Sequence, residues 1–397
     1  MATLPERIPT DYLDGYQEAY NLNPELTANY IANAWVGDPL ADALMEDLSK
    51  MPREDSDRLI EAGIEQGSDD ELRDAPESLW AFFRSVEEVP SWVDFEGFHA
   101  GTRMFYRAGK IVLAAFTGGT LVEGFSTNIS KSFLITGRLR EQGVRRLRQN
   151  NRHMIEIFLP DGLQRYGDGW KLSVRLRLVH AQVRRLLAAS PDWNQDAWGV
   201  PISGAHMGYA AASFSSRTLY HLHRLGVRFS DEESRSFMAV WRYSGFLMGV
   251  PEDILYDTQE NANEIIKIGR MCEPSSNPES VIMANALINS APVVADVTDP
   301  VQRRSLVKYI YRVSRAMIGA ETADQLNFPK SSNFGVLAFF RWQSRYYQLL
   351  NKLFPGRPAS NSNFNSFSQF LGVSAFDDAG ISYRMPDHVY AERSRGW

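Results

Sequence analysis

Helical periodicity is the feature of this 397-residue chain that most constrains its fold. Apolar residues recur every three or four positions over long stretches, whereas the alternation typical of strands is scarce. Such a period places the apolar side chains on one face of a helix, and that face must be buried against other helices. The clearest stretches are residues 30–48, 77–89, 141–158, 172–189, 216–225, 231–249 and 305–317. We therefore predict an all-α fold.

The chain shows no internal repeat and no linker that divides it cleanly, so we predict one helical domain. We expect an N-terminal helical extension (1–95), a core that holds the functional site (96–260), and C-terminal helices with a tail (261–397).

Local signals mark several boundaries. Asp231 is followed by two glutamates and is expected to cap a helix, because acidic residues stabilise helix N-termini. The segment Pro160-Asp161-Gly162 should end another helix. The polar stretch 355–368 predicts a surface loop.

Composition argues against several classes of protein. The net charge is −6 and the basic residues are scattered, which argues against nucleic acid as the main partner. Cys272 is the single cysteine, which excludes internal disulfides and cysteine-rich metal sites. The first residues lack the features of a secretory leader, and apolar runs such as 111–116 are too short to span a bilayer. We therefore expect a cytoplasmic protein without a membrane span.

Most histidines carry no functional spacing. His221 and His223 point to different sides of a helix and cannot chelate one ion. The Glu-x-x-His at 96–99 has no second copy, as a di-iron bundle would need. Neither His206 nor His388 has supporting neighbours. The G-x-G-x-x-G, P-loop and G-x-S-x-G signatures are absent as well.

His180 is different, because it lies on a seam between an apolar and a cationic helix flank. The apolar flank holds Leu172, Leu176, Val183 and Leu187. Arg177 and Arg184 form the other flank. A haem has the same asymmetry: an apolar macrocycle, two carboxylate propionates, and iron that takes an axial imidazole. The alternative is an ordinary amphipathic helix whose histidine bonds a neighbouring carbonyl.

A second helical face, in residues 145–157, is unusually polar. Arg146, Gln149, Asn150 and His153 fall on one side of it. This side is too polar for a plain core and would suit the roof of a buried polar pocket. A solvated helix face is the alternative.

Several short motifs together suggest a family. They are WVGDPLADAL at 35–44, VPSWVD at 89–94, TGRL at 136–139, RRL at 145–147, RLRLVHAQVR at 175–184 and AVWRYSGFLMGVPEDIL at 239–255. In this order and spacing, the chain resembles the latex-clearing protein (rubber oxygenase) family and the wider group of MpaB-like oxygenases. The resemblance runs over most of the chain.

The resemblance implies a globin-like helical core around a b-type haem, with additional helices at both ends. It implies that His180 is the proximal iron ligand. Arg177 and Arg184 would then be placed to pair with the propionates. The chain has no Cys-x-x-Cys-His motif, so the haem would be non-covalent.

On the distal side, the resemblance matches Arg146 to an arginine that would stabilise bound oxygen. The rubber-cleaving members carry a lysine–threonine pair where this chain has Gln149 and Asn150. A distal glutamate is the family's proposed base, and Glu123 and Glu141 are the nearest candidates here.

The sixth iron site could be open, water-bound, closed by His153, or held weakly by the amide of Asn150 or Gln149. We expect it to be open or water-bound, because a position two turns from Arg146 often lies over the macrocycle's edge and neutral amides compete poorly with water for iron.

The leading functional hypothesis is a haem b-dependent oxygenase that uses O₂ on an unsaturated, isoprenoid-like or other small apolar metabolite. Rubber is not the expected substrate, because no export signal is visible and the distal residues have changed. The alternatives are a non-catalytic haem sensor or carrier, and a helical scaffold that has lost its haem. An oxygenase needs a cavity for an organic substrate, whereas a carrier can pack that space shut.

Overall fold

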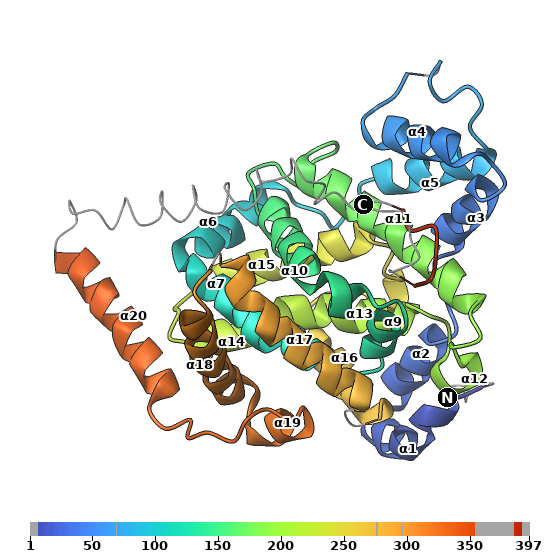
Figure 1. Cartoon of the computed structure of the whole chain (residues 1–397). Helices are drawn as coiled ribbons and strands as arrows, with labels where there is room; N and C mark the ends of the chain where they lie inside the picture. The colour runs from blue at the N-terminus through green and yellow to red at the C-terminus, as the bar shows by residue number, and fades with distance from the viewer. Residues whose placement is uncertain (1–6, 69, 275–276, 296, 354–384, 391–397) are drawn as a thin grey trace.

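The computed structural model describes residues 7–68, 70–274, 277–295, 297–353 and 385–390. Within these residues the chain forms α-helices, 3₁₀-helices and π-helices and no strand, which confirms the predicted all-α fold (Figure 1). The N-terminal helices are α1 (Leu13–Leu22), α2 (Pro24–Asn33), α3 (Pro39–Leu48), α4 (Arg53–Ile64) and α5 (Glu77–Glu87).

The middle of the chain and its C-terminal part are also helical. The middle helices are α6 (His99–Ala108), α7 (Lys110–Ala115), α8 (Leu121–Gly124), α9 (Ile129–Ile135), α10 (Arg138–Ile157), α11 (Asp168–Ala188), α12 (Gln195–Trp198), α13 (Gly204–Ala212), α14 (Thr218–Arg224), α15 (Asp231–Leu247) and α16 (Gln259–Cys272). The C-terminal helices are α17 (Pro278–Val294), α18 (Pro300–Ile318), α19 (Ala320–Gln325) and α20 (Val336–Leu353).

The stretch 30–48, expected to be helical throughout, is divided between α2 and α3. That expectation was wrong because proline disfavours a helical backbone in the residue before it. Asp38 is extended, and its carboxylate accepts a hydrogen bond from the Ala41 backbone N–H at 3.2 Å. Pro39 then begins α3, where its missing N–H costs nothing. The break places the Asp38 carboxylate at the N-terminus of a helix that packs against α11.

Ser230, rather than Asp231, caps α15. The Ser230 hydroxyl accepts a hydrogen bond from the Glu233 N–H at 3.1 Å, and the Glu233 carboxylate accepts one from the Ser230 N–H at 2.9 Å. This reciprocal capping box satisfies two N–H groups that the helix cannot pair itself. Asp231 is the first helical residue, so the predicted cap was one residue late. The helix α10 ends at Ile157, shortly before Pro160, as predicted.

The helices α10, α11 and α15 form the centre on which the site is built (Figure 1). The helix α10 packs against α11 and α17, and α11 also packs against α3 and α15. The helices α10 and α11 touch where one ends and the other begins. A Cβ at Gly169 would lie 2.7 Å from the carbonyl oxygen of Glu156. Phe158, just after α10, stacks on Phe105 at 4.5 Å and on Phe237 at 4.8 Å, which ties this end to α6 and α15.

Within the described residues, two π-helices face each other beside this centre, η3 (Phe116–Thr120) and η4 (Ser213–Arg217). The hydroxyls of Thr120 and Thr218 lie 3.0 Å apart, and the rings of Phe116 and Phe214 have centroids 5.2 Å apart. π-helices are rare and occur frequently at functional sites. Their position therefore indicates where such a site should be sought.

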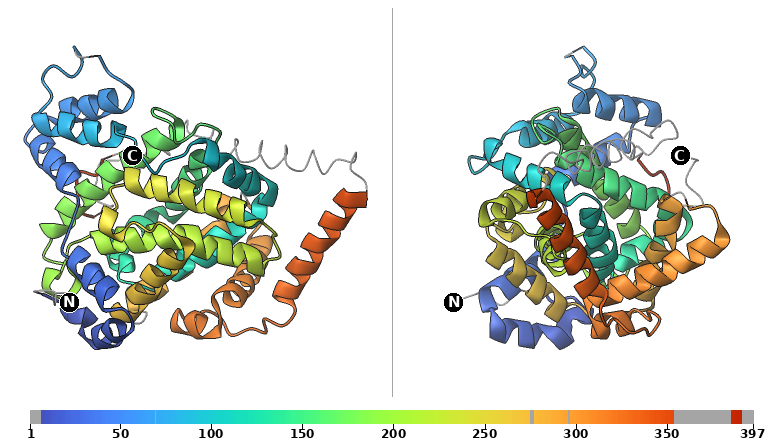
Figure 2. Two further views of the ribbon diagram at one scale, coloured as in Figure 1. Left: turned by 180° about the vertical axis from the view of Figure 1, so that it is seen from behind. Right: turned by 90° about the vertical axis from the view of Figure 1, so that its left-hand side faces the viewer.

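No helix in the described part of the chain is long and apolar enough to cross a membrane. The helix α20 projects from one end of the molecule beside α18 (Figure 2). The polar loop predicted at 355–368 lies outside the described residues.

Candidate functional site

A cavity of about 170 Å³ lies among α9, α10, α11, α13 and η4. The empty space between its walls, including the part open to solvent, is about 1290 Å³. Most of the wall is apolar. Apolar side chains of the wall include Phe125, Phe133, Leu176, Val179, Phe214 and Met248. Apolar walls with a few polar groups are typical of sites for small molecules and cofactors.

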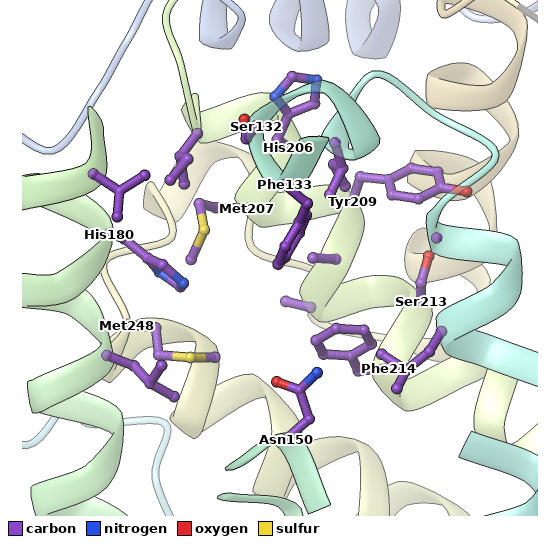
Figure 3. Close-up of a pocket in the computed structure, with 18 of the residues that line it drawn as sticks. Ser132, Phe133, Asn150, His180, His206, Met207, Tyr209, Ser213, Phe214 and Met248 are labelled. Carbon is purple, nitrogen blue, oxygen red and sulfur yellow. The ribbon is translucent and has the colours of Figure 1, made fainter. Parts of the chain in front are cut away.

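His180 projects from α11 into this cavity (Figure 3). Its helix neighbours Leu176 and Val183 line the same wall. Leu172 and Leu187 are buried in the apolar cluster that adjoins the wall. The apolar flank found by helical counting is therefore the face that α11 turns toward the cavity and its adjoining cluster.

Asn150 enters the cavity from α10, and its amide points inward from another side than His180 (Figure 3). His153 also lines the cavity, whereas Gln149 is buried outside the wall. The side chains of Arg146 and Glu141 lie outside the described part of the structure. The polar face predicted on α10 thus contributes Asn150 and His153 to the cavity.

The imidazole of His153 is bound by hydroxyl groups. Its Nε2 lies 3.0 Å from the Ser173 Oγ and 3.3 Å from the Ser244 Oγ. Burial lowers the pKa of His153 to about 3, because the charged form of the ring loses its hydration. The ring is therefore neutral, and its Nε2 is engaged with two serines.

Arg177 and Arg184 bind carboxylates of α3. Arg177 bonds Asp38 in a fork, with its Nε at 2.6 Å and its Nη2 at 2.9 Å from the two oxygens. Arg184 bonds Asp42 at 2.9 Å and the Ile202 carbonyl at 2.6 Å. Neither arginine lines the cavity. In this structure both guanidinium groups join α11 to α3, and their pairing with haem propionates stays a prediction.

The carboxylate of Glu123, a candidate base, is bound by two arginines. Arg217 bonds both of its carboxylate oxygens at 2.8 Å, and Arg270 bonds one of them at 2.9 Å. Burial alone raises the pKa of Glu123, but these hydrogen bonds, with His221 nearby, outweigh it and hold the pKa well below the usual range. Such a carboxylate is a weak base, and it does not line the cavity, so the structure does not support a base role for Glu123.

Helical counting missed the wall contributed by α13 and η4. His206, Tyr209 and Ser213 line the cavity from this segment. The His206 Nε2 lies 3.2 Å from the Tyr12 hydroxyl and 3.4 Å from the Glu273 carboxylate. The only signal in the sequence was the abundance of glycine and alanine at 204–213, which allows close helix packing but does not show what lies opposite.

The residues present fit a haem better than a bare metal ion. The described residues contain no group of three or more His, Cys, Asp or Glu side chains that could hold an ion. Haem iron needs an axial ligand from the protein, because the macrocycle supplies the other bonds. One imidazole projecting between apolar walls meets that need.

Comparisons with known proteins show the family to which the chain belongs. A family model described as "ER-bound oxygenase mpaB/B'/Rubber oxygenase, catalytic domain" matches residues 103–346. The rubber oxygenase of Streptomyces sp. (strain K30) is 24% identical over 259 residues, which are 64% of this chain and 61% of that protein. The match therefore spans less than two thirds of the relative's length.

A solved structure shows the same fold. It is titled "Structure of Latex Clearing Protein LCP in the closed state", with a TM-score of 0.68 and 21% sequence identity over 89% of this chain and 95% of that chain. The family match covers more than half of the chain, including all of α10 and α11. The resemblance noted in the sequence is thus confirmed: the chain belongs to the family of MpaB-type and rubber oxygenase catalytic domains.

Proposed function

We propose that this protein is a haem b-dependent oxygenase that uses O₂ on a small, apolar, unsaturated substrate of isoprenoid-like character. The observation that carries the proposal is the imidazole of His180, which projects into an apolar cavity in a chain of this family (Figure 3). When bound, haem supplies the redox chemistry that activates O₂.

In this proposal the protein's own residues bind, orient and exclude water. His180 would hold the haem through its iron. The Asn150 amide, which points into the cavity, donates a hydrogen bond to a polar group held there. Phe133 and Phe214 supply apolar surface for the substrate and exclude water. Arg146, earlier on α10, remains the proposed stabiliser of oxygen on the strength of the family resemblance.

The substrate class follows from the cavity wall and the distal residues. The wall is mostly apolar, which suits a hydrocarbon-like molecule. The rubber-cleaving members carry a lysine–threonine pair where this chain has Gln149 and Asn150. We therefore propose a small apolar metabolite, rather than the polymer in the relative's name, as the substrate.

The cofactor is tested by the visible absorption spectrum of freshly purified protein, before and after dithionite. We expect a haem spectrum, with a cofactor that acid–acetone extracts. His180→Ala should lose most of the haem and keep the helical circular dichroism. His206→Gln changes another histidine of the same cavity and should keep its haem. Full haem occupancy in His180→Ala would show that the ligand is wrong.

The activity is tested by oxygen consumption and product analysis with a panel of unsaturated terpenoid and fatty compounds. Oxygen uptake coupled to formation of an oxygenated product supports the proposal. A haem protein that binds O₂ reversibly and turns over no compound of the panel would favour the sensor or carrier.

A further inference from the structure

Three helices meet at one buried hydrogen-bonded group beside the cavity. His153 comes from α10, Ser173 from α11 and Ser244 from α15, and all three are buried. The His153 Nε2 lies 3.0 Å from the Ser173 Oγ and 3.3 Å from the Ser244 Oγ, and the two hydroxyls are 3.2 Å apart. We call these three residues the His153 clamp.

The hydrogens of the clamp can all be accounted for without a charge. The Ser173 hydroxyl donates to the Gly169 carbonyl at 2.7 Å, so its oxygen acts as an acceptor within the clamp. The Ser244 hydroxyl then donates to Ser173 or to His153, and the neutral imidazole completes the group in either tautomer. A charged imidazole at this buried position would be costly. The hydrogens on the Nε2 side of the clamp can therefore be placed with a neutral imidazole.

Its position along the helices connects it to the cavity. His153 lies about one turn after Asn150 on α10, and Ser173 lies about two turns before His180 on α11. The two helices touch at Gly169, where a Cβ would meet the Glu156 carbonyl oxygen at 2.7 Å. The clamp therefore lies between this contact and the residues Asn150 and His180, and its own His153 also lines the cavity.

We propose that His153 is a positioning residue: through Ser173 and Ser244 it sets the separation of α10 and α11 across the cavity, and so the placement of Asn150 relative to His180. The inference rests on the proposed function in one respect, namely that this separation is the width of a haem slot. In this proposal His153 acts through the helices rather than as an iron ligand, because its Nε2 is held by two serine hydroxyls.

The test compares three clamp variants with a matched control. His153→Phe keeps a ring and removes the hydrogen bonds, Ser244→Ala removes one hydroxyl, and His153→Gln keeps a hydrogen-bonding group. Ser215→Ala is the control, because Ser215 is a fully buried serine whose hydroxyl bonds the Ala211 and Ala212 carbonyls and does not line the cavity.

The main readout is imidazole binding to the ferric protein by spectral titration. Losing the clamp should weaken it roughly three- to tenfold in His153→Phe and Ser244→Ala, the range expected for one or two hydrogen bonds. His153→Gln should recover most of the affinity, and Ser215→Ala should stay within about twofold of the wild type even where its melting temperature falls. A wild-type affinity for imidazole in His153→Phe would overturn the proposal. The proposal would also fail if the affinity fell in proportion to thermal stability in all variants, including Ser215→Ala. So would a ferric spectrum that changes from low-spin to high-spin in His153→Phe, which would make His153 a ligand.

A second readout does not need haem. Amide hydrogen exchange in residues 146–157 and 168–188 should speed up in His153→Phe and not in Ser215→Ala. If the protein binds no haem, the proposed function fails while this measurement still tests the clamp. Unchanged exchange in His153→Phe would refute the clamp alone.

Discussion

Arg177 bonds both carboxylate oxygens of Asp38, at 2.6 and 2.9 Å, and both side chains are buried. The pair joins α11, which carries His180, to the N-terminus of α3. This buried ion pair therefore holds the helix of the cavity histidine against α3.

Arg177→Gln should lower the free energy of unfolding by roughly 3–5 kcal/mol, because it leaves the buried Asp38 carboxylate without its partner. Arg175→Gln is the matched control, since Arg175 pairs with the more exposed Glu61 and should cost no more than about 1 kcal/mol. Urea unfolding followed by circular dichroism measures both. Equal, small losses would show that the Arg177–Asp38 pair contributes little.

The ionised Glu123 carboxylate should stabilise the protein at neutral pH, and this contribution to the free energy of unfolding should be lost in acid. Its folded pKa is depressed below the ordinary 4.5 by Arg217 and its neighbours, despite burial. A depressed folded pKa stabilises the protein fully above the unfolded value, and that contribution is lost as the pH falls below it. Glu123→Gln should therefore be less stable than the wild type by roughly 3–5 kcal/mol at pH 7. The difference in the free energy of unfolding between the wild type and Glu123→Gln should become smaller as the pH is lowered from about 5 to 3. A difference that stays constant over this range would contradict the assignment.

Gly169 and Gly124 should respond oppositely to alanine. A Cβ at Gly169 would lie 2.7 Å from the Glu156 carbonyl oxygen and 2.8 Å from the Ile157 Cα, whereas a Cβ at Gly124 meets nothing within 4 Å. Gly169→Ala should destabilise by roughly 1–3 kcal/mol because α10 and α11 must move apart. Gly124→Ala should be neutral or stabilise by up to about 1 kcal/mol. Melting temperatures of the two variants decide the matter, and a neutral Gly169→Ala would disprove the close contact.

Asn150→Leu should distinguish polar from apolar ligands of the proposed haem. It removes the cavity-facing amide and keeps a similar volume. Binding of ligands that accept hydrogen bonds, such as cyanide, should weaken roughly two- to tenfold, while carbon monoxide binding should change little. Ligand titrations of the ferric and ferrous proteins measure the two effects. Parallel changes for both ligands would mean that the cavity has been reshaped instead.

The ferric protein should be pentacoordinate or water-ligated at neutral pH, and it should bind imidazole readily. The physical reason is that the His153 Nε2 is already engaged by Ser173 and Ser244. Absorption and electron paramagnetic resonance spectra should therefore be high-spin. A low-spin spectrum that becomes high-spin in His153→Ala would show that the ring leaves its serines to close the site.

The helical class of the fold could be predicted because it depends on local spacing. The period of apolar residues fixes which side of each helix is buried, and on α11 it assigned Leu176 and Val183 to the flank that proves to line the cavity with His180. The family motifs are likewise short and continuous. Boundaries were less secure where proline competes with the periodic pattern, as at Pro39.

The partners of the charged and polar groups were decided by the tertiary structure alone. Helical counting placed Arg177 beside His180, but only folding brings Asp38, 139 residues away, onto its guanidinium. In the same way, His153 was found on a polar face, while its serines come from two other helices. A sequence period defines the direction in which a side chain points, and the group that it meets depends on how distant helices pack.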